Sequence, residues 1–155
     1  LTQAAGRAGR GDVPGKVVIQ TYKPDNYAIT AAASQNYRAF YDIEEAYRSL
    51  MRYPPEWNMM VIMGTGMDEE QLANIMDRMY SLIRGKYINA GHLSVIGPSE
   101  PAISKIKDVY RRVLYIKHRD YRMLVDVKDY VEEWLKENGE NDVSVFFDLN
   151  PVNMY

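Results

Sequence analysis

Met59-Met60-Val61-Ile62-Met63 is an unbroken apolar run near the middle of this 155-residue chain. A short run of this kind predicts a buried strand. A helix is expected to follow it, because Asp68 is a favoured N-cap residue and Gly85 is a favoured residue for ending a helix. The predicted inward side of this helix repeats at helical spacing and consists of Leu72, Ile75, Met76, Met79 and Leu82.

The rest of the C-terminal part continues with strand and helix patterns. Residues 93–96 and 110–117 are expected to form a second and a third strand, and Asp120 is expected to cap a second helix that ends near Gly139. In residues 143–149 every second side chain is apolar, which is typical of a half-buried strand. The order β-α-β-β-α-β predicts an α+β domain of the split βαβ, ferredoxin-like type, with both helices on one face of the sheet.

The sequence before residue 53 has other patterns. Residues 17–22 are rich in β-branched side chains and predict a short strand. Residues 25–52 carry apolar side chains at helical spacing. Tyr53-Pro54-Pro55 is expected to end that helix, because a residue that precedes proline is pushed out of the α region. We therefore expect a domain boundary that separates residues 1–52 from residues 53–155.

The composition excludes several classes of protein. The net charge is −2, so any nucleic-acid-binding surface has to be a local basic patch. The chain has no cysteine, which excludes disulfides and cysteine zinc sites within it and suits a cytosolic protein. No apolar run approaches the roughly 18 residues that cross a bilayer. Because the chain starts at Leu1 without a signal-peptide pattern, we expect it to be a piece of a longer protein.

The N-terminal segment contains the pattern Q-x-x-G-R-x-G-R, formed by Gln3, Gly6, Arg7, Gly9 and Arg10. It offers two guanidinium groups on a segment whose glycines let a ligand approach the backbone closely. Arginine is favoured where a phosphoryl oxygen is held by two hydrogen bonds, and an arginine that reaches a γ-phosphate stabilises charge in the transition state. A glycine–arginine segment alone is also typical of RNA-binding tails. Gln3 and the strand predicted after it favour the phosphate-contacting interpretation.

The pattern resembles motif VI of superfamily 2 helicases. Residues 11–22 narrow the resemblance to the C-terminal part of the bacterial primosomal replication-restart DNA helicases, the primosomal protein N′ family. The resemblance covers essentially the whole chain. It is also carried by Phe40-Tyr41-Asp42-Ile43-Glu44-Glu45, the Arg48 to Tyr53-Pro54-Pro55 spacing, Val95-Ile96-Gly97-Pro98, Tyr110-Arg111 and Asp148-Leu149-Asn150-Pro151-Val152-Asn153-Met154.

The resemblance implies the end of a RecA-like helicase lobe followed by a C-terminal domain similar to ribosomal protein S10. It implies an ATP-dependent 3′-to-5′ DNA helicase that binds stalled replication forks and starts replisome reloading. Arg10 would then be the first candidate for the arginine finger, with Arg7 beside it at the phosphates. Gln3, Gly6 and Gly9 would contact the bound nucleotide.

The resemblance also implies ATP with magnesium, and zinc, in the full-length protein. This chain contains neither a GxxxxGK[ST] loop nor an acidic Walker B box, so we expect it to be inactive alone. Zinc is expected on cysteines that precede motif VI, and no metal or cofactor is expected within this chain. The implied partners are forked and single-stranded DNA, the single-stranded-DNA-binding protein, other primosome proteins and the replicative helicase, in the bacterial cytoplasm at the nucleoid and without a membrane.

Basic side chains gather around the third predicted strand. Residues 105–122 contain seven basic and two acidic side chains, whereas residues 126–142 contain two basic and seven acidic ones. If Leu114 and Ile116 face the core, alternate residues of this strand face the opposite side of the sheet. Cations and aromatic rings on one sheet face suit phosphate contacts and base stacking. The candidates for DNA binding are Arg111, Tyr115, Lys117, Phe146, Lys105 and Lys107.

Several alternatives stay open. A solvated strand, or a sheet face covered by the helicase lobes, would give the same pattern of side chains. Arg122, at the start of the second predicted helix and near Lys117, is the candidate contact for the acidic tail of the partner protein. The alternative function is a ferredoxin-like module that binds a small molecule or RNA without a helicase role. A DNA platform would lose affinity steeply as salt rises, whereas a small-molecule sensor would not.

Overall fold

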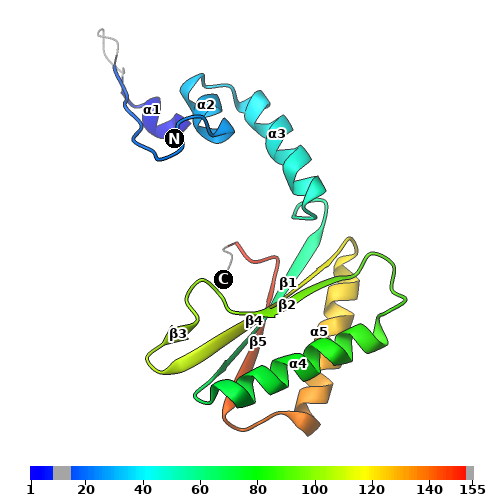
Figure 1. The fold of residues 1–155 in the computed structure, drawn as a ribbon. Coiled ribbons are helices and arrows are strands. Elements are labelled where there is room, and N and C mark those ends of the chain that lie inside the picture. Colours follow the sequence, from blue (N-terminus) through cyan, green and yellow to red (C-terminus); the bar gives the residue numbers. More distant parts are fainter. Residues whose placement is uncertain (9–14, 153–155) are drawn as a thin grey trace. The chain divides into compact units, whose positions relative to one another are not determined.

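The computed structural model describes residues 1–8 and 15–152. The chain divides into two compact units, Leu1–Leu50 and Met51–Tyr155. Figure 1 shows helices joined by loops in the first unit, and a sheet with the long helices α4 and α5 in the second. Within the described residues, no helix is both long enough and apolar enough to cross a membrane.

The first unit contains α1 (Thr2–Ala5), α2 (Tyr27–Ala33) and α3 (Tyr37–Leu50). Asparagine side chains start the two longer helices, because each accepts a hydrogen bond from a first-turn backbone N–H that has no partner inside its helix. Asn26 Oδ1 accepts from the N–H of Ala28 at 2.9 Å, and Asn36 Oδ1 accepts from the N–H of Ala39 at 3.0 Å.

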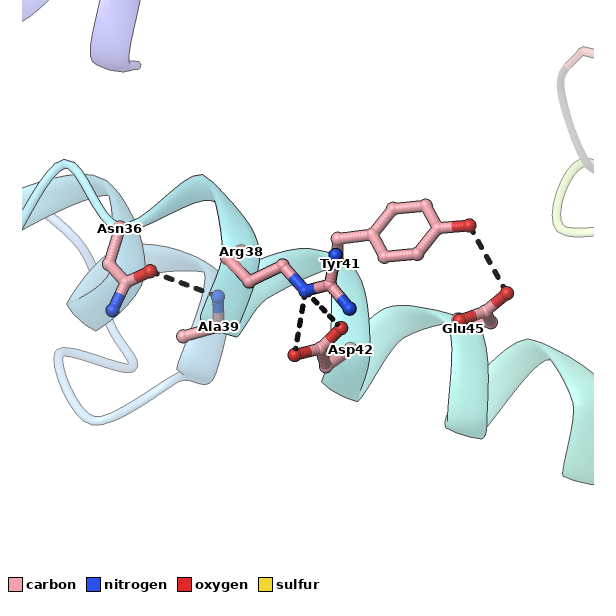
Figure 2. Close-up of polar contacts among 6 residues, drawn as sticks. All are labelled: Asn36, Arg38, Ala39, Tyr41, Asp42 and Glu45. Carbon is pink, nitrogen blue, oxygen red and sulfur yellow. Dashed lines mark hydrogen bonds and ion pairs between the residues drawn. The ribbon is translucent and has the colours of Figure 1, made fainter.

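Polar pairs one turn apart line part of α3 (Figure 2). Arg38 forms an ion pair with Asp42 at 3.0 Å, and the hydroxyl of Tyr41 donates to Glu45 at 3.1 Å. Pairs at this spacing support a helix only by a few tenths of a kcal/mol each, about 0.2–0.5. The apolar side chains of α3 are largely exposed within this unit; Leu50 is 80% exposed.

Two expectations for this unit need correction. Residues 17–22 do not form a strand, because a strand needs a neighbour for its backbone groups and the described residues of the unit offer none. The helical pattern of residues 25–52 is divided between α2 and α3 by a break at residues 34–36, and α3 ends at Leu50, before the two prolines.

The second unit is an α+β domain with a five-stranded sheet, which confirms the predicted class. Its main elements follow the order β-α-β-β-α-β, with one two-residue strand, β3, added before β4. The strands lie in the order β2-β4-β1-β5, and each pair of neighbours in this order is antiparallel. The elements are β1 (Asn58–Gly66), α4 (Glu69–Lys86), β2 (Ser94–Ser99), β3 (Lys105–Ile106), β4 (Val109–His118), α5 (Tyr121–Asn138) and β5 (Val143–Leu149).

Both helices pack against the same face of the sheet, as Figure 1 also shows. The inward residues of β1 and β4 meet the apolar sides of α4 and α5 there, and all of them are buried. Burial of such side chains stabilises the fold by roughly 1.5–3 kcal/mol each. The central members of this core are Met60, Ile62, Leu72, Met76, Leu114, Ile116, Leu124 and Val127.

The predicted caps of the two long helices are present. Asp68 accepts a hydrogen bond from the N–H of Gln71 at 2.9 Å, and Asp120 accepts one from the N–H of Arg122 at 2.9 Å. Gly139 caps the end of α5. The helix α4 ends at Lys86, one residue after the predicted stop at Gly85, and its C-cap residue is Tyr87 rather than the glycine.

The opposite face of the sheet, named the second face from here on, has its own small core. Val61, Met63 and Val113 are buried on it, with the half-buried Tyr115 against them. The central strand β1 is therefore apolar on both faces, which explains why its sequence shows no alternation.

Candidate functional site

The segment predicted to be motif VI is described in part. Gln3 lies in α1, Gly6 follows the end of that helix with a right-handed φ of −66°, and Arg7 lies in the turn after it. All three residues are exposed. Gly9 and Arg10 lie outside the described residues. Within the described segment, Gln3 lies in a short helix and Arg7 in the turn that follows it. The arrangement of the whole motif stays a prediction, because it also includes Gly9 and Arg10.

Gln3 contributes to a hollow of about 330 Å³ in the first unit. The hollow is formed by α1, α2 and α3, and its lining is mostly apolar; Phe40 and Tyr37 supply the aromatic part. Arg7 is not among the lining residues. The structure therefore does not bring Gln3 and Arg7 together in one described pocket.

The four strand residues predicted for DNA binding share the second face. Antiparallel register places Tyr115 opposite Val61, Lys117 opposite Met59 and Phe146 opposite Met63. Arg111 stands opposite Thr65 at the other end of β4. The alternation expected from the sequence is therefore correct, while contact with DNA stays a prediction.

Arg111 is held against the second face. One terminal nitrogen of its guanidinium lies 3.2 Å from the sulfur of Met63, and the other donates to the carbonyl of Ile103 at 3.3 Å. Its backbone N–H donates to the carbonyl of Ser104 at 2.8 Å. Arg111 is thus a fixed, half-buried cation with donors left over for an anion.

Lys117 differs from the other candidates because it is only 6% exposed. Its amine donates to the carbonyl of Met51 at 3.1 Å and lies 3.7 Å from the centre of the Tyr53 ring. Burial lowers the pKa of Lys117, and the nearby charge of Arg52 lowers it further. A covered amine with these contacts is poorly placed to reach a phosphate, so the structure favours a positioning role for Lys117.

The two aromatic candidates differ in exposure. Phe146 keeps 40% of its surface exposed, whereas Tyr115 is half-buried. Burial raises the pKa of the Tyr115 hydroxyl, with a smaller contribution from Tyr53. Of the two rings, that of Phe146 offers more surface for stacking.

Lys105 and Lys107 lie in the β3–β4 hairpin. Lys107 and Asp108 form its two-residue turn, with positive φ values of 47° and 64°, as a type I′ turn requires. Lys105 pairs with Asp108 at 3.2 Å, and its amine lies 4.4 Å from the centre of the Tyr110 ring. The hydrogen bonds that the Lys105 amine donates to Tyr110 and Asp108 raise the pKa of Lys105. Both lysines are exposed, and Lys107 forms no ion pair among the described residues.

A cluster of side chains around Trp57 was not predicted from the sequence. The guanidinium of Arg52 lies 5.0 Å from the centre of the Trp57 ring, and that of Arg119 lies 5.3 Å from it. Trp57 is 4% exposed, and the ring of His92 lies edge-on to it at 6.3 Å. The two arginines are exposed and lie 67 positions apart in the sequence, so only the fold brings them together. No local spacing could have revealed this cluster.

Arg122, the candidate contact for a partner tail, is exposed in the first turn of α5. The acidic side chain of Asp120 accepts from the backbone N–H of Arg122. The structure therefore leaves the Arg122 guanidinium at the surface beside the start of the helix, and its role stays a prediction. The described residues contain no group of three or more side chains that could hold a metal ion.

Comparison with known proteins relates the whole chain to one family. Residues 49–152 match the family model "Primosomal protein N C-terminal domain". The chain is 32% identical to "Replication restart protein PriA" of Bacillus subtilis over 99% of its length, and 28% identical to the protein of that name from Synechocystis over 99%. It is 30% identical to that of Chlamydia trachomatis over its full length.

The chain spans about a fifth of these relatives, since the matches cover 19%, 18% and 20% of their lengths. Among solved structures, the de novo designed protein Foldit4 aligns with a TM-score of 0.48 and 13% identity, over 63% of this chain and 100% of that chain.

Proposed function

Because the chain belongs to the Primosomal protein N C-terminal domain family, we propose that it is the C-terminal part of an ATP-dependent 3′-to-5′ DNA helicase that acts in replication restart. In this proposal the protein binds stalled forks and starts replisome reloading, in the cytoplasm at the nucleoid. The similarity to replication restart proteins over the whole chain supports it.

The first unit would end a RecA-like lobe and contribute to ATP hydrolysis. Arg10 would stabilise the transferred phosphoryl group, with Arg7 and Gln3 beside the nucleotide. ATP and magnesium would be held mainly by other parts of the protein, because this chain carries no phosphate-binding loop. Zinc would bind cysteines elsewhere, since this chain has none.

The second unit would be the S10-like, ferredoxin-like domain. Its element order and the sheet order β2-β4-β1-β5 support that assignment. In the proposal this domain contacts the fork and other proteins of the primosome, including the single-stranded-DNA-binding protein through Arg122 and, in a later step, the replicative helicase.

The Trp57 cluster is the observation that best supports DNA binding by this domain. Arg52 and Arg119 are exposed, and neither forms an ion pair with an acidic side chain within residues 1–8 and 15–152. Their guanidinium groups lie over an indole ring, which positions them while leaving N–H donors available. Phosphates are the anions that such arginines contact most in nucleic-acid complexes.

The positive charges around Arg52 also support DNA binding. The charge of Arg52 contributes to the lowered pKa of Lys117, so these two cations repel each other. A phosphate beside Arg52 would relieve that repulsion. Phe146 and Arg111 on the second face, with Lys105 and Lys107 in the hairpin, would extend the contact along the DNA.

Binding of a fluorescent fork DNA at several salt concentrations tests this proposal. Replacement of both Arg52 and Arg119 by alanine should weaken binding by roughly tenfold or more and flatten the slope of log affinity against log salt by about two. Arg78→Ala is the matched control, because Arg78 lies 5.0 Å from the Trp134 ring in the same kind of stack. Equal weakening by both changes, or binding that ignores salt, would contradict the proposal. A small-molecule sensor would show the second result.

A further inference from the structure

The two long edges of the sheet are built differently. At the β2 edge, Pro98 has no N–H to offer, and the pairing with β4 shifts register between Ile96 and Ser99. Such features prevent another strand from pairing with an edge. At the β5 edge, Val143 to Leu149 contains no proline and no lysine, and its one charged residue is Asp148. This edge lacks the protection that the other edge has.

The hydrogen-bond pattern shows which backbone groups face outward from β5. The N–H of Asn150 donates to the carbonyl of Met59 at 2.7 Å, and the pair Met60–Leu149 follows in register. Hydrogen-bonded pairs in an antiparallel ladder recur at every second residue. Phe146 therefore directs its backbone N–H and C=O toward β1, whereas Val145 and Phe147 direct theirs away from the sheet.

The outward backbone groups lie beside a groove. Side chains of α5 and β5 line a hollow of about 580 Å³ at this edge. The lining residues are Lys128, Glu132, Leu135, Lys136, Val145, Phe146 and Phe147. The groove thus combines free strand positions, an apolar floor and a charged rim, which is the arrangement that accepts an added strand.

The charges on the rim indicate what kind of strand fits. Lys128 already pairs with Glu132 at 2.8 Å and with Asp129 at 3.3 Å. Lys136 is exposed, and no ion pair to it is found in the described part of the chain. The Lys136 amine is therefore available to pair with a carboxylate of an incoming strand.

A second copy of the chain fits less well. On the side that faces α5, a β5 strand from a second copy would present only Val143, Val145, Phe147 and Leu149, which are all apolar. Its one acidic side chain, Asp148, lies on the other face with Phe146 and brings no carboxylate to Lys136. A strand from another protein can carry an acidic side chain on the α5 side.

We propose that the β5 edge binds an extended peptide segment of another protein by strand addition, with apolar side chains in the α5–β5 groove and an acidic side chain at Lys136. The backbone groups of Val145 and Phe147 form the hydrogen bonds to the peptide, and the groove determines which of its side chains fit. This inference does not depend on the Trp57 cluster, because the edge and the groove share no residue with it. Of the residues proposed to contact DNA, Phe146 alone also lines the groove.

The test uses the 155-residue chain and two synthetic ten-residue peptides. Both carry alternating valine and serine; one is flanked by aspartates and the other by lysines. Amide hydrogen exchange is followed by NMR during titration. The acidic peptide should slow exchange at Val145 and Phe147 by tenfold or more, while Phe146, already bonded to β1, changes little. Equal change at all three amides, or none, would overturn the proposal.

Two variants make the test specific. Val145→Pro removes an outward N–H without removing a bond to β1, and it should abolish the protection at Phe147. Lys136→Glu, at an exposed position, leaves the strand intact and should reverse the preference so that the lysine-flanked peptide binds better. If Lys136→Glu leaves the preference unchanged, or if protection depends on protein concentration without peptide, the assigned partner is wrong.

Discussion

The amine of Lys117 lies 3.7 Å from the centre of the Tyr53 ring, so a buried lysine near the end of β4 is covered by the segment that leads into β1. The carbonyl of Met51, two residues earlier, accepts a hydrogen bond from the same amine. A single side chain from β4 thus fixes the course of the chain just before the first strand. This contact is within the second unit and gives its N-terminal end a defined place.

Lys117→Met should change how stability depends on pH. The folded state lowers the pKa of Lys117 below the ordinary 10.5, so the unfolded state binds the proton more tightly in the alkaline range. The contribution of Lys117 to the free energy of unfolding therefore rises as pH increases from the lowered pKa toward 10.5. In urea unfolding at several pH values, the free energy of unfolding of the wild type should increase relative to that of the variant as pH rises. A difference that stays constant would contradict this assignment.

Gly64→Ala should destabilise the second unit by about 1–3 kcal/mol through overpacking. A Cβ at Gly64 would lie 2.6 Å from the sulfur of Met76 and 2.9 Å from a methyl group of Leu72, in the core between β1 and α4. Gly85→Ala is the control, because nothing lies within 4 Å of its added Cβ and the site is inside a helix. It should stabilise by about 0.5–1 kcal/mol. Thermal unfolding of both variants checks the opposite signs.

Asn150→Ala should cost about 2–3 kcal/mol. The Oδ1 atom of Asn150 accepts from the N–H of Met59 at 2.9 Å, and the residue has a positive φ of 52°, which alanine tolerates poorly. Loss of the acceptor leaves a buried donor unpaired, and the backbone strain adds to that cost. Asn150→Gly should cost less. It also removes the acceptor, but glycine adopts a positive φ without strain. If denaturant unfolding shows that the glycine variant is less stable than the alanine variant, this account is wrong.

Tyr27→Phe should raise the pKa of Glu44. The hydroxyl of Tyr27 donates a hydrogen bond to Glu44, which is the main cause of the lowered pKa of that carboxylate; Arg48 contributes next. The stability gained from this pair is present above the unfolded pKa and is lost as pH falls through the folded value. A carboxyl ¹³C titration measures the shift. Tyr41→Phe, which removes a bond to Glu45 instead, should leave the titration of Glu44 in place.

Arg10→Ala should slow DNA-stimulated ATP hydrolysis by the full-length protein by a factor of roughly 10³ or more, if Arg10 is the finger that motif VI implies. Arg7→Ala should have a smaller effect, and neither change should alter the fold. ATP turnover is measured at saturating fork DNA. Normal turnover in the Arg10 variant would remove the proposed catalytic role of this segment.

Most elements of the second unit were predictable because their signals are local. The run from Met59 to Met63, the caps Asp68 and Asp120, and the alternation of residues 143–149 each specify one element without help from distant residues. Failures occurred where tertiary context decides the outcome. Residues 17–22 have strand composition but no strand partner among the described residues.

The candidate site was predictable only where one strand carries it. Alternation placed Arg111, Tyr115 and Lys117 on one face correctly. It could not show that Lys117 is buried, because the covering segment comes from residues 51–53, far away in the sequence. The pairing of Arg52 with Arg119 across Trp57 is likewise a product of topology.

The central place of β1 in the sheet has a consequence for synthesis of the protein. Its two neighbours, β4 and β5, both follow it in the sequence, and β5 ends at Leu149. While the chain emerges from the ribosome, the apolar strand from Met59 to Met63 cannot form all of its backbone hydrogen bonds until both neighbours have been synthesised. We therefore expect ribosome-bound chains that stop before residue 143 to remain sensitive to protease and to be recognised by chaperones, whereas chains with residue 149 outside the exit tunnel become resistant.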